Sequence, residues 1–207
     1  MKNIFKDNTK NYTYGGLYGS SGSYIIEEIS RNFDNTIILL NNNSEIINFS
    51  NELKLFSRAD KEISLFLEIE SFPYESLIYD VNVLSERLKT YKNIINGGNN
   101  IIVTSYSAIS KYLVPNDILS KYFFKINKKF KYNELISLLR DLKYDRTEKV
   151  LNKGEYAIKG AIIDVYSTVE DKPIRMNFDN DKLETIKTFN VDSQISKDSI
   201  DDFTLGA

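Results

Sequence analysis

Residues 156–166 read YAIKGAIIDVY, and two segments of the same kind follow, IRMNF at 174–178 and LETIKTF at 183–189. All three are rich in β-branched and aromatic residues, and turn-forming residues such as Pro, Asp and Asn separate them. Short runs of this composition, joined by such turns, are typical of strands. The sequence therefore predicts a small antiparallel sheet in this part of the chain.

The middle segment also predicts the two faces of that sheet. Successive side chains of a strand point to opposite faces. Arg175 and Asn177 therefore share one face, whereas Ile174, Met176 and Phe178 share the other. We expect the apolar face to pack on a core and the polar face to remain available for recognition.

An amphipathic helix and a basic stretch precede this sheet. The helix is predicted from Asn133 onward, because leucines recur there at helical spacing: Leu135, Leu138, Leu139 and Leu142. Before it, KYFFKI at 121–126 alternates as a strand does. The basic stretch contains Lys125, Lys128, Lys129 and Lys131. Together with the strands that follow, these segments indicate a small α+β domain.

The N-terminal half has a different pattern. Short apolar runs at 36–40, 65–69 and 101–105 are bounded by polar residues, and helical patterns lie between them. Ser44 is the predicted N-cap of the helix after the first run. Strands that alternate with helices favour βαβ units and a parallel sheet. We therefore predict one region at 1–118 and a second, of the different pattern described above, at 119–190. The acidic tail, 191–207, stops just after an apolar FTL, so we expect it to begin a further domain of a longer protein.

The composition excludes many kinds of site. The 207 residues contain no Cys and no His, which excludes disulfides, thiolate or imidazole metal sites and Ser–His or Cys catalysis. With 27 Lys and Arg against 29 Asp and Glu, the net charge of −2 provides no overall field for nucleic acid. No apolar run approaches the roughly 20 residues of a membrane span, so we expect a cytoplasmic protein with no membrane contact.

Residues 16–23, GLYGSSGS, lie in the register of a phosphate-binding loop, G-x-x-x-x-G-K-[ST]. The residues that carry this comparison are Gly16, Gly19, Ser21, Gly22 and Ser23. Ser21 replaces the second glycine and Gly22 replaces the lysine, while Ser23 keeps a hydroxyl at the magnesium position. Because that lysine contacts the β- and γ-phosphates, its loss argues against ATP hydrolysis by this chain. We therefore expect no catalytic residue, no metal and no cofactor here.

Several segments, in order, resemble one family, the UvrB-like N-terminal module of the bacterial transcription-repair coupling factors (Mfd). They are GLYGSSGSY at 16–24, FPYESLIYD at 72–80, SERL at 85–88, IIVTSYSAI at 101–109, YDRTEKVLNKGEYAIKGAIIDVY at 144–166, PIRMNFDND at 173–181 and FNVDSQ at 189–194. The resemblance covers nearly the whole chain. It implies an incomplete helicase-like, P-loop-type parallel-sheet domain with a smaller inserted α+β domain that contains an antiparallel sheet.

The same resemblance implies a docking function. In that family the inserted domain binds UvrA, the damage-recognition ATPase of excision repair, through the polar face of its sheet. Two arginine positions of the family's motifs fall on Lys159 and Arg175, and Asn177, Glu155 and Asp179 are further candidates for the UvrA-binding surface. A contact with the C-terminal part of the parent protein is a second expected role. RNA polymerase, DNA and ATP are expected to engage other domains of that protein, an ATP-dependent DNA translocase.

Two alternatives compete with docking. One is a UvrB-like, nucleotide-binding helicase fragment, which the glycine at position 22 opposes. The other is a module that binds DNA directly through the lysines of 121–131, for which strongly salt-dependent binding to bare DNA would be the sign.

Overall fold

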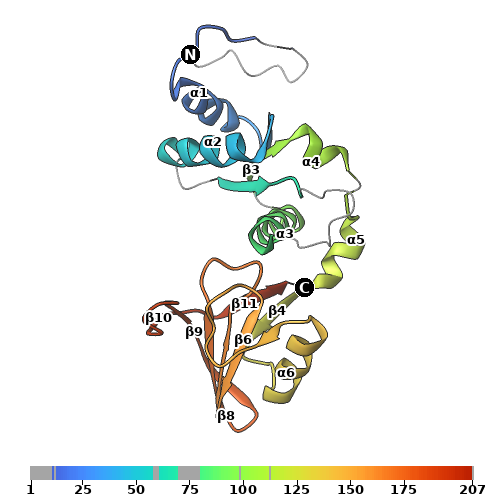
Figure 1. The fold of residues 1–207 in the computed structure, drawn as a ribbon, viewed down its shortest axis with the longest axis vertical. Coiled ribbons are helices and arrows are strands. Elements are labelled where there is room, and N and C mark those ends of the chain that lie inside the picture. The colour runs from blue at the N-terminus through green and yellow to red at the C-terminus, as the bar shows by residue number, and fades with distance from the viewer. Residues whose placement is uncertain are drawn as a thin grey trace. The chain divides into compact units, whose positions relative to one another are not determined.

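The computed structural model describes residues 11, 13–57, 61–69, 80–97, 99–111 and 113–206. The chain divides into two compact units, and Figure 1 labels their elements. Unit 1 comprises Met1–Tyr79 and Asn93–Leu113, and unit 2 comprises Asp80–Lys92 and Val114–Ala207. No helix in the described part of the chain has the length and apolarity that crossing a bilayer requires.

Unit 1 is a three-stranded parallel sheet with helices. Its elements are α1 (Ser21–Ser30), β1 (Asn35–Leu40), α2 (Asn43–Phe56), β2 (Glu62–Phe66), β3 (Asn100–Ser105) and α4 (Tyr106–Ser110). The strand order is β1-β3-β2, and both pairs are parallel, as the alternating pattern predicts. The second strand begins at Glu62 rather than at Leu65.

The core of unit 1 lies between the sheet and α2, which packs against β2 and β3. Ile101 and Val103 on β3 and Ile46 and Leu53 on α2 are buried. The predicted N-cap, Ser44, is wrong. Asn42 caps α2 instead, because its backbone is extended ahead of the helix and its side chain accepts a hydrogen bond from the Glu45 amide at 2.9 Å.

Unit 2 contains most of the strands. Its elements include most of α3 (Val81–Ile95), then α5 (Asn116–Leu119), η1 (Ser120–Tyr122), β4 (Phe123–Asn127), α6 (Tyr132–Asp141), β5 (Asp145–Arg146), β6 (Glu155–Lys159), β7 (Ile162–Val165), β8 (Ile174–Asp179), β9 (Lys182–Phe189), β10 (Ser196–Ser199) and β11 (Asp202–Gly206). A six-stranded sheet has the order β10-β9-β8-β7-β6-β5 and is antiparallel except for β5 and β6. A second sheet pairs β11 with β4.

The large sheet buries one face under α6, as Figure 1 shows. Leu135 and Leu139 of α6 join Ile163, Met176 and Ile186 of the sheet in one core. The predicted amphipathic helix is thereby confirmed. The predicted alternation of the middle strand is also confirmed: its three apolar residues, Ile174, Met176 and Phe178, are buried, while Asn177 is exposed.

The structural units and the sequence-based regions divide the chain differently. The structure assigns 80–92 to unit 2, ahead of the boundary expected at 118. It also places 196–206 in unit 2 through strand pairing, since β10 pairs with β9 and β11 pairs with β4. The three-region division at 118 and 190 stays a prediction.

Side chains from other segments are hydrogen-bonded to the backbone of β11 along the edge that faces away from β4. Ser167 donates its hydroxyl to the carbonyl of Thr204 at 2.7 Å, and Glu170 accepts from the amide of Thr204 at 3.0 Å. The carbonyl of Gly206 accepts from the hydroxyls of Tyr144 at 2.8 Å and of a threonine at 3.2 Å. Side chains thus satisfy backbone groups that a further strand would otherwise pair with.

Candidate docking face

The exposed face of the large sheet carries a row of aligned residues. Strand register places Lys159 of β6 opposite Ile162, Ile162 opposite Asn177, and Asn177 opposite Thr185. Lys159, Asn177 and Thr185 are exposed, and Ile162 is half-buried. This docking row, Lys159–Ile162–Asn177–Thr185, combines a cation, an amide, a hydroxyl and an aliphatic group across four strands. Such a mixed surface suits recognition of a protein partner.

Arg175 lies one row away and is already engaged within the protein. Its guanidinium makes two hydrogen bonds to Asp164, Nε to Oδ1 at 2.7 Å and Nη2 to Oδ2 at 2.8 Å. It also donates to the carbonyl of Gln194 at 2.9 Å and stacks on Phe189 with 4.8 Å to the ring centroid. The Asp164 side chain is 1% exposed and that of Arg175 22%. Hydrogen bonding to Asp164 raises the pKa of Arg175.

Glu155 organises a loop rather than presenting a free carboxylate. Its side chain accepts from the amides of Leu151 at 2.7 Å and Asn152 at 2.9 Å, and from the Asn152 side chain at 2.9 Å. Partial burial acts to raise the pKa of Glu155, but these hydrogen bonds outweigh it and the pKa is lowered. The loop before β6 is therefore fixed by this carboxylate.

Asp179 is exposed at the end of β8, where the chain turns into β9. Asn180, in the turn, has a φ of 53° and donates its side-chain amide to Asp179 at 3.4 Å. Asp179 therefore lies at the same end of the sheet as Lys159 and Asn177. Glu155 begins the strand that Lys159 ends, so those two residues lie at opposite ends of β6.

The structure thus brings Lys159 and Asn177 together, with Asp179 nearby, and separates them from Glu155. It adds Ile162 and Thr185, which the sequence did not single out as recognition residues. The sequence did contain an indication that Arg175 would form an internal ion pair. Asp164 is the single acidic residue in the apolar segment 156–166. An acidic residue in a buried strand requires a partner, and Arg175 lies opposite it in register.

The glycine-rich loop of unit 1 has a different environment from a phosphate-binding loop. Gly16 and Gly19 have positive φ values of 73° and 54°, and α1 begins at Ser21 with Gly22 in its first turn. The hydroxyl of Ser23 donates to a carboxylate oxygen of Glu52 at 3.0 Å. That carboxylate would repel a phosphate. Among residues 13–18, no strand precedes the helix as one does in a phosphate-binding loop.

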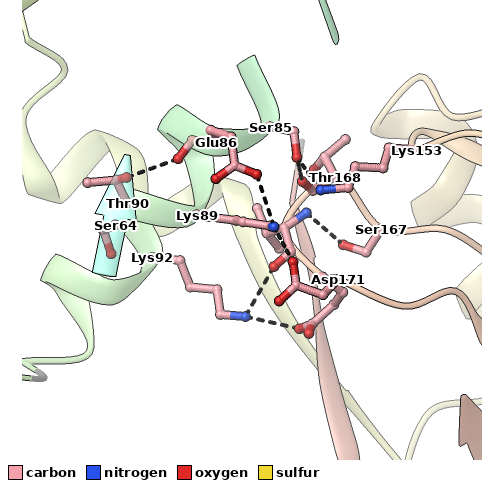
Figure 2. A network of polar contacts seen from close by, with 12 residues as sticks. Ser64, Ser85, Glu86, Lys89, Thr90, Lys92, Lys153, Ser167, Thr168 and Asp171 are labelled. Carbon is pink, nitrogen blue, oxygen red and sulfur yellow. Dashed lines mark hydrogen bonds and ion pairs between the residues drawn. The ribbon is translucent and has the colours of Figure 1, made fainter. Parts of the chain in front are cut away.

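Figure 2 shows a polar network that attaches α3 to the segment 167–171. Lys89 lies between Glu86 at 3.1 Å and Asp171, and Lys92 contacts Glu170 at 3.0 Å and the carbonyl of Val169 at 3.3 Å. Glu170 is also the group that accepts from β11, so α3 and β11 share one carboxylate.

Ser85 of α3 extends this network toward β6. Its hydroxyl donates to the carbonyl of Thr168 and accepts from the amine of Lys153 at 2.6 Å. The polar network, defined as Ser85, Glu86, Lys89, Lys92, Lys153, Thr168, Glu170 and Asp171, lies within unit 2. No group of acidic residues that suits a metal ion occurs in the part of the chain that is described.

Comparison with known proteins finds a family model that matches the C-terminal part of the chain and relatives that match most of it. The family model described as the UvrB interaction domain matches residues 123–207. The transcription-repair-coupling factor of Rickettsia prowazekii is 31% identical over 177 residues, which is 84% of this chain and 16% of that protein. The corresponding proteins of Rickettsia bellii and Bacillus subtilis are 29% and 23% identical, over 88% and 99% of this chain.

These relatives are much longer than the chain, which spans 16% to 18% of their length. The match at 123–207 covers the two-sheet part of unit 2 but not α3. Of the resembling segments, 72–79 lies outside the described residues. Residues 123–207 thus match the UvrB interaction domain, and the chain as a whole is similar to part of the bacterial transcription-repair-coupling factors.

Proposed function

We propose that this chain is a docking module that recruits UvrA through the exposed face of its large sheet. The observation that carries the proposal is the docking row, a largely exposed surface of mixed character on the sheet, within the region matched by the UvrB interaction domain. Lys159 and Asn177 are the residues proposed at its centre, and Asp179 is proposed at its margin. Arg175 and Glu155 are proposed to support the face from within rather than to reach the partner.

The larger setting follows from the named relatives. We propose that the parent protein couples transcription to repair by linking a stalled RNA polymerase to excision repair in the cytoplasm. ATP, DNA and polymerase would be handled by other parts of that protein, and its C-terminal part would cover the docking face when UvrA is absent. Unit 1 would be a degenerate P-loop-type domain without ATPase activity. The glycine at position 22 and the Ser23–Glu52 contact support this assignment.

The alternative of direct DNA binding receives less support. Lys125, within the basic stretch, is paired with Asp202 at 3.0 Å. The acidic net charge also disfavours a nucleic-acid partner. A nucleotide-binding function is opposed by the carboxylate of Glu52 at the loop.

Titration calorimetry with UvrA from the same organism tests the proposal. Lys159→Glu is expected to weaken binding by about 2 kcal/mol or more, roughly 30-fold, if this residue lies at the interface centre. The matched control is Arg140→Glu, an exposed position on α6, which packs on the opposite face of the sheet. Equal weakening by both variants, or no binding by the unaltered chain, would refute docking through this face.

A further inference from the structure

Three turns of unit 2 meet at the end of the large sheet that carries the docking row. Lys131, in the segment between β4 and α6, forms an isolated antiparallel bridge with Lys182, at the start of β9. The amide of Tyr132 donates to Asp181, in the turn between β8 and β9, at 3.1 Å. The hydroxyl of Tyr132 donates to the carbonyl of Gly160, in the turn after β6, at 3.0 Å. The three turns therefore border the docking row, whose first member ends β6.

Four lysines lie on these turns or at their ends, and all four are exposed: Lys128, Lys129, Lys131 and Lys182. We call them the lysine cluster. In the part of the chain that the structure describes, none of the four has an ion-pair partner, whereas the neighbouring Lys125 is paired with an aspartate at 3.0 Å. The ammonium groups of the lysine cluster are therefore available to a partner.

The bridge between Lys131 and Lys182 sets two like charges opposite each other. Opposed residues of an antiparallel pair have their side chains on the same face, with Cβ atoms about 5 Å apart, and like charges in such a pair lower stability. An anionic group between the two amines would replace this repulsion by two attractions. Because neither lysine has an ion-pair partner among the described residues, we infer that the anionic group comes from outside the molecule.

Four carboxylates near the lysine cluster decide which kind of anion fits: Glu134, Asp179, Asp181 and Glu184. Asp181 and Glu134 accept hydrogen bonds from backbone amides at 3.1 and 3.3 Å, which fixes their places beside the lysines. A nucleic-acid backbone presents phosphates along its whole length, and these carboxylates would repel it. A protein surface presents single carboxylates among neutral and cationic groups, so it can match both signs.

We propose that the lysine cluster extends the docking face and binds an acidic side chain of the protein partner between Lys131 and Lys182. The inference rests on the proposed function, because the partner that it names is UvrA. The contact lies on other segments than the docking row, so it adds to recognition by Lys159 and Asn177. Exposed ion pairs of this kind are weakened by salt, and this salt dependence distinguishes the contact from apolar docking.

The double variant Lys131→Gln/Lys182→Gln tests the contact by titration calorimetry of the whole chain with UvrA. At about 50 mM salt we expect its affinity to be ~5-fold below that of the unaltered chain, and at about 500 mM the difference should be less than ~2-fold, because salt screens the attraction. The matched control is Lys121→Gln/Lys149→Gln, which changes the net charge equally at two exposed positions away from these turns. The control should bind as the unaltered chain does.

Thermal unfolding of the same double variant tests whether the two lysines have a structural role instead. Removal of two opposed charges should leave the melting temperature unchanged or raise it slightly. A melting temperature clearly below that of the unaltered chain would show that the two lysines stabilise the fold, and it would overturn the inference.

Three binding results would also overturn the inference. Equal affinities of the double variant and its control at low salt would do so while leaving docking through the sheet in place. Absence of binding by the unaltered chain would overturn both this inference and the proposed function. Salt-dependent binding of the unaltered chain to duplex DNA, lost in the double variant, would assign the lysine cluster to nucleic acid.

Discussion

Arg175 of β8 and Asp164 of β7 form a bidentate ion pair, with Nε–Oδ1 and Nη2–Oδ2 distances of 2.7 and 2.8 Å. The carboxylate is buried beneath the exposed face of the sheet, and the guanidinium covers it while stacking on Phe189. A residue that family resemblance assigns to partner binding therefore has a demanding structural task. A substitution of Arg175 is therefore expected to reduce the stability of the fold, whatever its effect on partner binding.

Breaking this pair from either side should destabilise the protein. Arg175→Ala leaves Asp164 buried without its cation, and Asp164→Ala leaves the guanidinium without its carboxylate, so each is expected to lower the free energy of unfolding by about 3 kcal/mol. The double variant should lose less than the sum, because no unpaired charge remains. Urea unfolding of the four proteins measures the coupling. Additive losses would show that the two side chains act independently.

A methyl group at Gly206 should be poorly tolerated. A Cβ there would lie 2.6 Å from the hydroxyl oxygen of Thr168 and 2.7 Å from a methyl of Val169. Gly206→Ala is therefore expected to destabilise by about 2 kcal/mol in thermal or urea unfolding. Gly22→Ala is the matched control, because nothing lies within 4 Å of a Cβ at that position in α1. The control should be neutral or stabilising by up to about 1 kcal/mol. Equal effects at both glycines would contradict the close approach.

Lys153 should give the protein a pH-dependent stability. Its pKa is about 8 in the folded chain and near the ordinary 10.5 when unfolded, so the unfolded state holds more protons between these values. The cost of holding the charged amine is therefore fully present below pH 8 and is relieved as pH rises toward 10.5. Relative to Lys153→Met, the unaltered chain should gain stability over that interval. A difference that stays constant from pH 7.5 to 10 would show that the amine titrates normally.

Glu155 should affect the loop before β6 rather than the partner directly. Glu155→Gln replaces one accepting oxygen by a donor that faces the amides of Leu151 and Asn152, so we expect a loss of about 1–2 kcal/mol in urea unfolding. Because the pKa of Glu155 is lowered in the folded protein, the carboxylate contributes its full stabilisation at pH values above the ordinary pKa of a glutamate. That stabilisation is lost as the pH falls through the pKa of Glu155 in the folded protein. The variant should therefore match the unaltered chain most closely at acidic pH. A loss of UvrA affinity without any loss of stability would instead assign Glu155 to the interface.

Local sequence patterns predicted the strands within 156–189, the helix after Asn133 and the faces of the sheet, but not β10 and β11. The alternation at 174–178 predicts which side chains are buried, because a strand with one apolar face has a single favourable orientation. The leucine spacing after Asn133 predicts α6 for the same reason, since its apolar stripe must face the core. The helix cap at Asn42 was missed because three adjacent asparagines and a serine all qualify as caps, and only the backbone selects among them.

The site depended on contacts that no local pattern contains. Arg175 meets Asp164 through strand register, and Lys153 meets Ser85 across 68 positions of sequence. The place of α3 in unit 2 likewise rests on contacts with residues far along the chain. The family model, which begins at residue 123, does not include this helix. Long-range partners of this kind decide whether a charged residue is free to bind or already committed.

The side chains that cover the edge of β11 have one more consequence. A strand with unpaired backbone groups invites a strand from another molecule, and that is how folded domains begin to form fibres or exchange segments. Ser167 and Glu170 are hydrogen-bonded to the carbonyl and the amide of Thr204, which a strand from another molecule would otherwise pair with. We therefore expect the segment 167–171, which holds α3, also to limit association between molecules, and variants that lack the Ser167 and Glu170 side chains to be less soluble.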